Sequence, residues 1–328
     1  MNAFSYLRPT DVGSALQARS TPGAMFIGGG TNLLDLVKSD IEHPSMLIDI
    51  NELDLAAITP LPDGGLSIGA LARNSDMAAH PELRKRYPLL AQAIVAGASQ
   101  QLRNMATAGG NLLQRTRCYY FVDPAFGQCN KKVPGSGCAA LHGEQRLHAI
   151  LGASPHCIAT NPSDMNVALA ALDARVRVQG PRGERTIAFE DFHRLPGERP
   201  DIDTTLEPGE LILSIDLPPE GFADHSHYLK IRDRASYAFA LVSVAVACEL
   251  DGKTVRDVRI ALGGVAHKPW RARAAEQHLA GRRLDAASAR AAGEAAMADA
   301  RTFPGNAFKK TLVPRAIERA LRNAGALA

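Results

Sequence analysis

The sequence predicts an α/β domain followed by a smaller α+β domain. Over roughly the first hundred residues, short apolar strand patterns alternate with helical patterns, which is typical of a sheet covered by helices. Proline and glycine then cluster between residues 195 and 222, as they do where domains are joined. Beyond this segment, two long alternating runs are joined by Asp251-Gly252-Lys253, and Asp-Gly between such runs is a hairpin signal. We therefore expect domains at residues 1–221 and 222–328.

The N-terminal elements can be assigned in chain order. The segment PTDVGSALQA begins as a helix capped by Thr10 or Asp11, because a side-chain oxygen can accept one of the unpaired first N–H groups. AMFIGG, MLIDI and GLSIGA are short apolar runs and are predicted strands. The predicted helices of this region are TNLLDLVKSD, NSDMAAHPELRKR and PLLAQAIVAGASQ.

Between Gly110 and Cys157 the apolar repeat fails, and prolines and glycines are frequent. A loop this long inside a compact domain is usually functional or disordered. The cysteines in this loop favour a functional loop over a disordered one. Something other than a hydrophobic core must order the loop, and cysteine ligands could do so. Regular patterns resume with SDMNVALAALDA, a predicted helix, and ARVRVQG, a predicted strand. The alanine-rich tail after Trp270 is predicted to be helical and to serve packing.

Composition and charge exclude several classes of protein. The hydrophobic fraction of 46% and the charged fraction of 22% are those of an ordinary globular chain. The net charge of +3 is small and no basic patch with interleaved aromatic residues occurs, so we expect no nucleic-acid partner. No run approaches about 18 apolar residues, so we expect no membrane span.

The N-terminal segment MNAFSYLRPTDVG has neither the basic n-region nor the apolar h-region of an export signal. It therefore predicts folding in the cytoplasm. Export of the folded chain together with a partner that carries a signal is compatible with this expectation.

The five cysteines are unevenly distributed, with Cys118, Cys129, Cys138 and Cys157 close together and Cys248 alone. In a chain folded under reducing conditions a disulfide framework is disfavoured. The clustered four are a candidate ligand set, and Cys248 is expected to be a small buried hydrophobe. Their spacing matches neither a ferredoxin run nor the paired knuckles of most zinc sites, so spacing alone leaves iron–sulfur and zinc open.

Two glycine-rich loops, FIGGGTNLL and TAGGNL, have a similar character. Glycine lets backbone N–H groups approach a ligand, and a following helix favours an anion, so a diphosphate is the expected ligand. The first loop fits the dinucleotide fingerprint incompletely. Gly28 and Gly30 match its first two glycines, but Leu33 stands at the position of the third glycine. Asp49 lies near the expected acidic position. Taken alone it is equally a tight turn. A Rossmann domain has one such loop, so the pair predicts a different nucleotide-binding fold.

The loops GGGTNLL and TAGGNLL resemble the two FAD-diphosphate loops in flavoprotein subunits of the molybdenum hydroxylase family, which includes carbon monoxide dehydrogenase and xanthine dehydrogenase. The resemblance covers essentially the whole chain. It implies an FAD-binding domain of the vanillyl-alcohol-oxidase (PCMH) type, with two α/β subdomains and the flavin between them. A smaller α+β C-terminal domain follows in that family.

The resemblance also implies a set of site residues and no catalytic residue on this chain. NPSDMNVALAALDA is similar to the segment whose aspartate contacts the adenosine ribose, which puts that role on Asp164. YLKIRDRASYAFALVSVAVA is similar to the start of the C-terminal domain, where Lys230 would lie near the flavin. The implied FAD-binding residues of the loops are Phe26, Ile27, Gly28, Gly29, Gly30, Thr31, Asn32, Leu33, Leu34, Thr107, Gly110 and Asn111.

Residues 113–157 form an insert that most members of this family lack. RTRCYYFVDPAFGQCNKKVPGSGCAALHG resembles the insert of periplasmic three-subunit aldehyde oxidoreductases more than that of 4-hydroxybenzoyl-CoA reductase, and in both the insert holds a [4Fe-4S] cluster. The cluster takes one thiolate per iron, which implies Cys118, Cys129, Cys138 and Cys157 as ligands. A flavin nearby favours an iron–sulfur cluster over zinc, because a redox centre beside a flavin can take part in electron transfer and zinc cannot.

The implied function is that of an electron-transfer subunit of an aldehyde oxidoreductase. A large molybdenum-cofactor subunit would oxidise aldehydes to carboxylic acids, and a small [2Fe-2S] subunit would pass the electrons to FAD and on to an external acceptor other than NAD. The three chains would form a heterotrimer. Its expected location is the periplasm, to which this chain would be exported with a signal-bearing partner; the alternative location is the cytoplasm. Two alternatives are the flavin subunit of a 4-hydroxybenzoyl-CoA reductase-like or xanthine dehydrogenase-like enzyme, and a zinc-stabilised nucleotide-binding module without a redox role.

Overall fold

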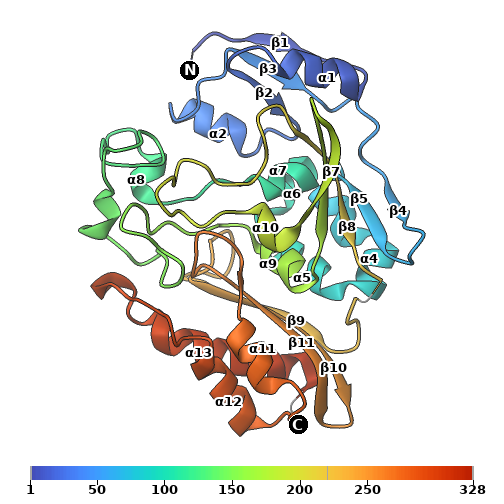
Figure 1. Cartoon of the computed structure of the whole chain (residues 1–328), viewed down its shortest axis with the longest axis vertical. Coiled ribbons are helices and arrows are strands. Elements are labelled where there is room, and N and C mark those ends of the chain that lie inside the picture. Colours follow the sequence, from blue (N-terminus) through green and yellow to red (C-terminus); the bar gives the residue numbers. More distant parts are fainter. Residues whose placement is uncertain (1, 220, 327–328) are drawn as a thin grey trace.

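The computed structural model describes residues 2–219 and 221–326, and Figure 1 shows how the elements are arranged. The strands form a three-stranded, a five-stranded and a four-stranded sheet. The first two sheets occupy the upper and middle parts of the view, and the third lies below them with the C-terminal helices beneath it (Figure 1). This confirms the predicted order of a larger α/β part with two subdomains and a smaller α+β part.

The first subdomain is a parallel sheet in the strand order β1-β3-β2. Parallel strands need crossover connections, and α1 and α2 supply them. Asp11 caps α1, as predicted, because its carboxylate accepts a hydrogen bond of 2.8 Å from the N–H of Ser14. The elements are β1 (Ser5–Leu7), α1 (Val12–Arg19), β2 (Ala24–Ile27), α2 (Leu33–Lys38) and β3 (Met46–Asp49).

The second subdomain contains an antiparallel sheet in the order β4-β5-β8-β6-β7. The predicted strand GLSIGA is β5, but it joins this sheet through antiparallel pairing with β8 and so does not continue the parallel alternation. The strands are β4 (Ile58–Pro60), β5 (Leu66–Gly69), β6 (Arg175–Gly180), β7 (Gly183–Ala188) and β8 (Leu211–Leu217).

Short helices surround the second sheet. NSDMAAHPELRKR forms two helices instead of the one predicted, because Pro81 has no N–H to continue α3 and begins α4. The helices are α3 (Asn74–Ala79), α4 (Pro81–Arg86), α5 (Pro88–Ala96), α6 (Gln100–Met105), α7 (Ala108–Leu112), α9 (Asp164–Ala171) and α10 (Phe189–Phe192).

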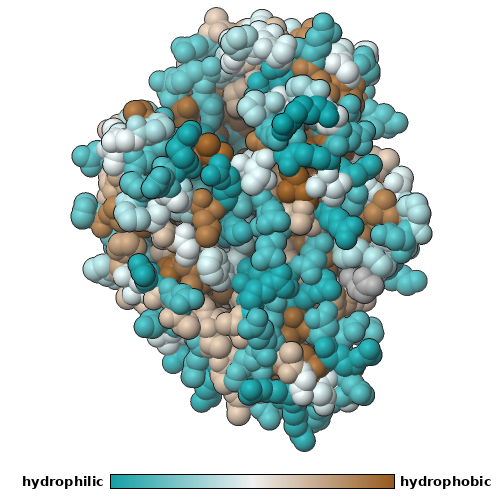
Figure 2. Space-filling view, viewed as in Figure 1, coloured by the Kyte–Doolittle hydropathy of each residue, from teal (hydrophilic) through white to brown (hydrophobic). Residues whose placement is uncertain are grey.

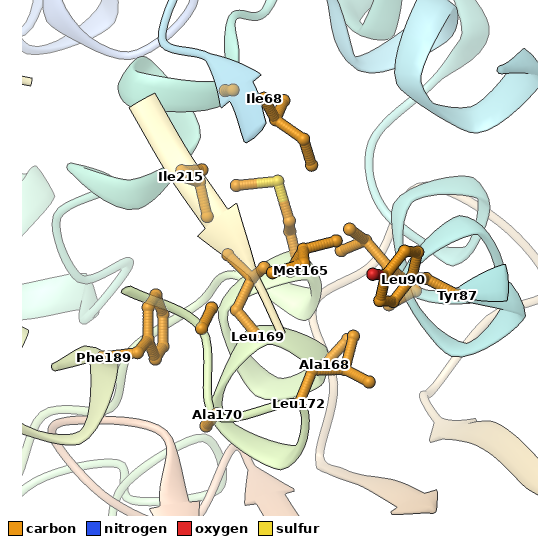
Figure 3. Close-up of a cluster of buried hydrophobic side chains, with 14 of the residues drawn as sticks. Ile68, Tyr87, Leu90, Met165, Ala168, Leu169, Ala170, Leu172, Phe189 and Ile215 are labelled. Atoms are coloured by element: carbon orange, nitrogen blue, oxygen red, sulfur yellow. The ribbon is translucent and has the colours of Figure 1, made fainter. Parts of the chain in front are cut away.

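Helix α9 lies in the middle of the main hydrophobic core. Every residue of the helix is buried. Figure 3 shows Met165 and Leu169 of α9 among side chains of the sheet and of α5. Burying a large aliphatic side chain contributes roughly 1.5–3 kcal/mol, so this packing fixes α9 firmly. Asp164, the first residue of the helix, is thereby fixed as well.

The C-terminal part is a four-stranded antiparallel sheet, β12-β11-β10-β9, covered by helices. The predicted hairpin is confirmed, since β10 pairs with β11 and Gly252 in the turn has a φ of 59°, which glycine adopts readily. The elements are β9 (Ser226–Ile231), β10 (Val242–Asp251), β11 (Thr254–Gly263), β12 (Trp270–Arg271), α11 (Arg273–Leu279), α12 (Ala286–Ala295), η2 (Pro304–Asn306), α13 (Lys309–Leu321) and the π-helical turn η3 (Arg322–Ala326).

The C-terminal sheet shares the core around α9. Tyr228, Ala245 and Ala261 belong to the same buried cluster as the residues of α9. One apolar cluster therefore extends across the predicted boundary at residues 221 and 222. The division of the chain into two domains at this boundary stays a prediction.

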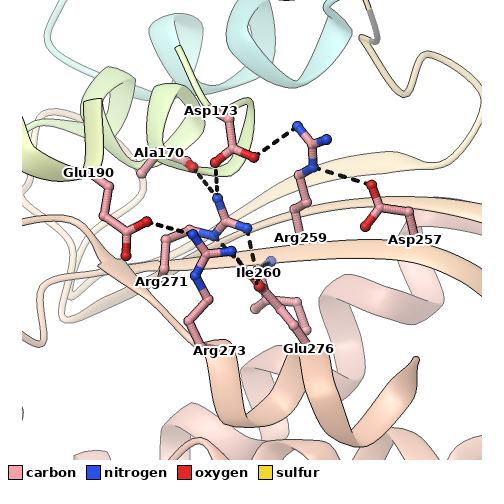
Figure 4. Close-up of polar contacts among 9 residues, drawn as sticks. All are labelled: Ala170, Asp173, Glu190, Asp257, Arg259, Ile260, Arg271, Arg273 and Glu276. Carbon is pink, nitrogen blue, oxygen red and sulfur yellow. Dashed lines mark hydrogen bonds and ion pairs between the residues drawn. The ribbon is translucent and has the colours of Figure 1, made fainter. Parts of the chain in front are cut away.

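A buried ion network also joins the two parts (Figure 4). The side chain of Arg271, at the end of β12, is 3% exposed and pairs with Asp173, just after α9. Its Nε donates to the Glu276 carboxylate of α11 at 2.8 Å, and its Nη1 donates to the carbonyl of Ala170 at 2.8 Å. An arginine buried this deeply requires such partners, so the network fixes α9 relative to the C-terminal sheet.

Residues 113–157 contain only short helical turns, α8 (Tyr119–Val122) and η1 (Ala139–Leu141). This confirms the predicted lack of a regular apolar repeat. The expectation that no hydrophobic core orders the segment was only partly right, because Phe121 and Tyr120 each anchor a small buried cluster. Polar bonds add to this, since the side-chain Oδ1 of Asn130 accepts from the N–H groups of Gly135 and Gly137, both at 3.0 Å.

Hydrophilic side chains cover most of the face seen in Figure 2, and apolar side chains lie among them in small groups. Within residues 2–219 and 221–326, no helix is both long and apolar enough to cross a membrane.

The cysteine-containing segment is attached to the loop around Asp203 by buried charges. The Asp203 carboxylate accepts a hydrogen bond from Nε of Arg115 at 2.9 Å and pairs with Lys131. The Lys131 side chain is 1% exposed, and its Nζ also donates to the carbonyl of Pro200 at 2.7 Å. Burial alone would raise the pKa of Asp203, but the charges of Lys131 and Arg115 lower it to about 2.

Because the pKa of Asp203 is depressed in the folded protein, the free energy of unfolding depends on pH. The unfolded chain, with an ordinary Asp pKa of 3.8, takes up the proton first as the pH falls. The stability from this carboxylate, about 2 kcal/mol, is therefore complete above pH ~4 and is lost between pH ~4 and ~2.

We expect Asp203→Asn to lower the urea midpoint at neutral pH, by the equivalent of about 3 kcal/mol, because Lys131 would remain buried without its partner. The variant should then lose less stability than the wild type when the pH is lowered to about 3. Asp201→Asn is the control, since its partner Arg199 is exposed and such pairs contribute about 1 kcal/mol or less. Equal behaviour of the two variants would contradict the assignment.

Candidate functional site

The two glycine loops lie against each other at the ends of β2 and α6. A Cβ on Gly28 would lie 3.1 Å from the hydroxyl of Thr107, and a Cβ on Gly29 would lie 1.8 Å from the carbonyl oxygen of Met105. The second distance is a clash with backbone, so position 29 must be glycine for the loops to meet. Gly30 has a φ of 74°, which also favours glycine.

Side chains outside the loops hold this contact in place. Nδ2 of Asn51 donates to the carbonyl of Gly28 at 3.0 Å. Arg73 donates to the Asn51 side chain at 2.9 Å and to the Met105 carbonyl at 2.5 Å. Thr107 caps α7 by accepting from the N–H of Gly110 at 3.2 Å. Neither Asn51 nor Arg73 belongs to a motif, so sequence reasoning missed both.

The loops line a cavity of about 190 Å³. Of the predicted loop residues, Leu34 is not part of its lining; the Leu34 side chain packs beneath Gly30 instead. The predicted residues that line it are Phe26, Ile27, Gly28, Gly29, Gly30, Thr31, Asn32, Leu33, Thr107 and Gly110.

A larger cavity of about 450 Å³ adjoins the first, because Thr31 and Asn32 line both. Asn111, Asp164 and Lys230 line this second cavity. Asn111 is linked to the start of α9, since its side-chain Oδ1 accepts from the Ser163 hydroxyl at 2.7 Å. The structure thus brings the predicted residues together in two joined cavities.

Asp164 and Lys230 form a buried ion pair. Nζ of Lys230 lies 2.7 Å from Oδ2 of Asp164, and the two side chains are 5% and 7% exposed. The other carboxylate oxygen accepts from the Tyr228 hydroxyl at 2.7 Å. Burial and the neighbouring Asp164 charge raise the pKa of Tyr228 well above its usual value, so this hydroxyl stays a donor. Asp164 and Lys230, predicted to contact the ribose and to lie near the flavin, are therefore in direct contact with each other, and both roles stay predictions.

Asp49 lies outside both cavities. Its carboxylate accepts hydrogen bonds from Tyr6, from Arg8 at 3.1 Å and from the N–H of Asn51 at 3.0 Å. Burial would raise its pKa, but these bonds hold the pKa of Asp49 below its usual value. The acidic position of the dinucleotide fingerprint is thus occupied by a structural residue.

The four clustered cysteines come from different turns of the 113–157 segment. Cys118 precedes α8 and packs beside both small apolar clusters of the segment. Cys129 and Cys138 face each other across an isolated antiparallel bridge. Cys157 is buried, and its sulfur accepts from the N–H of Ala159 at 3.4 Å. Cys248 lies apart from them, buried in β10.

Desolvation raises the pKa of three of these thiols. Burial, with a smaller contribution from the charges of Cys157 and Cys129, raises the pKa of Cys118 to about 12. Burial likewise raises the pKa of Cys138, and it raises the pKa of Cys157 to about 11. Backbone groups of Tyr120 and Ile158 point at Cys118 and Cys138 and oppose the rise. Such buried thiols ionise readily only when a cation compensates the charge. In the described part of the chain, no group of three or more His, Cys, Asp or Glu residues is arranged to hold a metal ion.

Comparison with known proteins agrees with this architecture. Residues 2–220 match the family described as the FAD binding domain in molybdopterin dehydrogenase, and residues 227–324 match the CO dehydrogenase flavoprotein C-terminal domain. The chain belongs to the FAD-binding subunits of the molybdopterin-dependent hydroxylases.

Members of this family resemble the chain over their full length. The aldehyde oxidoreductase FAD-binding subunit PaoB of Escherichia coli K12 is 52% identical over 330 residues, covering 100% of both chains. Carbon monoxide dehydrogenase from Hydrogenophaga pseudoflava is 27% identical, with a TM-score of 0.77 over 99% of this chain and 98% of that one. Quinoline 2-oxidoreductase from Pseudomonas putida 86 is 26% identical, with a TM-score of 0.76 and the same coverage.

The residues present fit the FAD that this family binds. Glycines leave the backbone of both loops open to a ligand, and the joined cavities offer polar groups along their length. Gly110 is the most direct indicator, because a Cβ there would meet only the Thr107 hydroxyl, at 2.9 Å, within 4 Å.

We expect Gly110→Ala to lower the flavin content of the natively purified protein and to lower its melting temperature less than Gly29→Ala does, because the added Cβ meets only the Thr107 hydroxyl that caps α7. The added methyl group would occupy space at the cavity without striking backbone. Gly29→Ala should lower both quantities, because the clash with Met105 costs about 1–3 kcal/mol.

Gly127→Ala is the matched control, since no atom lies within 4 Å of the added Cβ. It should retain both flavin and stability. Flavin absorbance per protein and thermal melting measure the two effects, and full flavin content in Gly110→Ala would contradict the placement.

Proposed function

We propose that this chain is the electron-transfer flavoprotein subunit of a molybdenum-containing aldehyde oxidoreductase. The observation that carries the proposal is the pair of glycine loops that meet at two adjacent cavities, together with a group of four cysteines of which two are buried and two partly buried. The full-length identity of 52% to an aldehyde oxidoreductase subunit supports the aldehyde class.

FAD would be held by backbone groups of the two loops and by the polar residues of the larger cavity. When bound, it supplies exchange of one or two electrons with other redox partners. The chain's own residues position it and exclude water. The Asp164–Lys230 pair presents a fixed, nearly neutral polar surface, because each charge already has a partner at 2.7 Å.

The four cysteines are proposed as ligands of a [4Fe-4S] cluster. Support comes from their number, from the burial of Cys129 and Cys157, and from backbone N–H groups directed at the sulfurs, which are features that tune such clusters. The nearby positive charge of Lys131 lowers the pKa of Cys157, so it would also favour the anionic thiolate form.

The partners in this proposal are a molybdenum-cofactor large subunit and a [2Fe-2S] small subunit in a heterotrimer. An external acceptor would take the electrons from this chain. Names of relatives such as the medium chain of carbon monoxide dehydrogenase support a multi-subunit enzyme. Export to the periplasm with a signal-bearing partner belongs to the same proposal and is tested by cell fractionation.

Native purification through an affinity tag on this chain tests the assignment. We expect a hetero-oligomer that oxidises aldehydes with a dye acceptor and contains about one FAD per copy of this chain, together with about four iron atoms of the [4Fe-4S] cluster and, in addition, the iron of the [2Fe-2S] subunit. A colourless, zinc-containing protein would support the nucleotide-binding module instead. An isolated monomer fully active on aldehydes would contradict the division of labour between subunits.

A second test concerns the cluster. Cys129→Ser should lose the iron of the [4Fe-4S] cluster and also FAD, because the segment that the cluster orders joins Asn111 to Asp164. Ordering of a segment by bound metal contributes on the order of 10 kcal/mol in other small metal-organised units. Cys248→Ser, a buried cysteine away from the group, should keep both cofactors. A Cys129→Ser protein that is fully flavinylated, fully assembled and only slower would refute the structural role.

A further inference from the structure

Arg117 connects the cysteine group with the FAD cavities. It immediately precedes Cys118 in the chain, and its side chain lines the cavity of about 450 Å³. It also lines a small adjoining space between Cys118 and Asp164. In that space Nε2 of His148 lies 3.1 Å from the Cys118 sulfur. Arg117 thus borders the candidate sites of both cofactors.

Three contacts fix the guanidinium of Arg117. Its Nη2 donates to Oδ1 of Asn32, in the first glycine loop, at 2.7 Å. Its Nη1 lies 3.6 Å from a carboxylate oxygen of Asp35 in α2. The guanidinium carbon lies 5.8 Å from the ring centre of Phe239, on another wall of the cavity. One side chain therefore joins the cysteine segment, the first loop and the segment after β9.

The charge of Arg117 is only loosely compensated. Asp35 is 59% exposed and lies 3.6 Å away, so water screens this pair. By contrast, Asp164 is paired with Lys230 at 2.7 Å, and Asp233 is paired with Arg146 at 2.6 Å. Arg117 consequently remains available to an anionic ligand of the cavity.

One donor of the guanidinium has no partner within the protein. Nε of Arg117 is buried, and no acceptor among residues 2–219 and 221–326 bonds it. This Nε is enclosed by protein atoms, so a ligand of the cavity meets the guanidinium through its other donors. FAD carries acceptor oxygens in its diphosphate, ribityl and ring portions, and arginine binds such oxygens through a planar set of donors.

We propose that Arg117 is an FAD-binding residue supplied by the cysteine segment. Its guanidinium holds Asn32 through Nη2, and its loosely compensated charge at the cavity wall binds an oxygen of FAD. The inference rests on the proposed function, because it requires FAD in the cavity between the loops. It gives the cysteine segment a direct part in flavin binding, since the side chain reaches Asn32 only when Cys118 is in place.

The test is an FAD titration of the native complex after reversible removal of flavin, followed by flavin fluorescence. Arg117→Gln should raise the dissociation constant about 10- to 100-fold, because a charged hydrogen bond is lost. The dissociation constant of Arg117→Lys should lie between those of Arg117→Gln and the wild type, since lysine keeps the charge but lacks the planar donors. Iron content and the melting temperature of the flavin-free protein should equal those of the wild type in both variants.

Lys132→Gln is the matched control in the same segment. It removes one positive charge and two hydrogen bonds to the carbonyls of Asp123 and Phe126, and Lys132 lines neither FAD cavity. Its FAD affinity should be unchanged.

Two results would overturn the inference. One is an Arg117→Gln protein that binds FAD as tightly as the wild type. The other is parallel loss of iron and FAD in Arg117→Gln, which would show that the residue only orders the segment. Wild-type protein that binds no FAD at all would instead refute the proposed function.

Discussion

The two glycine loops approach each other with no side chain between them, and the geometry of the site depends on this contact. A Cβ at position 29 would lie 1.8 Å from the carbonyl oxygen of Met105, so any other residue would separate the loops. The first loop leads into α2, and the second begins α7, whose Asn111 is bonded to Ser163 at the start of α9. The contact therefore links the small parallel sheet to the most deeply buried helix, and both cavities form along this link.

Buried charge pairs set the positions of the parts around this contact. Lys230 of β9 fixes Asp164 of α9, and Arg271 of β12 fixes the other end of the same helix through Asp173. Such pairs add little net stability compared with apolar packing, but breaking one leaves an uncompensated charge in the interior. They therefore act mainly as geometric constraints, and they attach the C-terminal sheet to the helix that carries the site.

The cysteine segment is ordered by several weak means in the protein itself. Two small apolar clusters, the turns around Asn130 and the charge of Lys131 on Asp203 each hold part of it. Burial raises the pKa values of the Cys118, Cys138 and Cys157 thiols, which is unfavourable for ligands until a cation neutralises them. The segment also separates Asn111 from Asp164 in the chain, so its order and the shape of the FAD cavities are coupled through its two ends.

Local features of this protein could be read from the sequence, because they depend on neighbours in the chain. The Asp11 cap, the β10–β11 hairpin, the glycine loops and the grouping of cysteines are of this kind. Tertiary structure alone decided that β5 pairs with β8, that Met105 closes on Gly29, and that Lys230 meets Asp164 across 66 positions of sequence. It also brought Arg117 to Asn32. These contacts have no periodic signal, because the packing of sheets and loops determines which distant side chains meet.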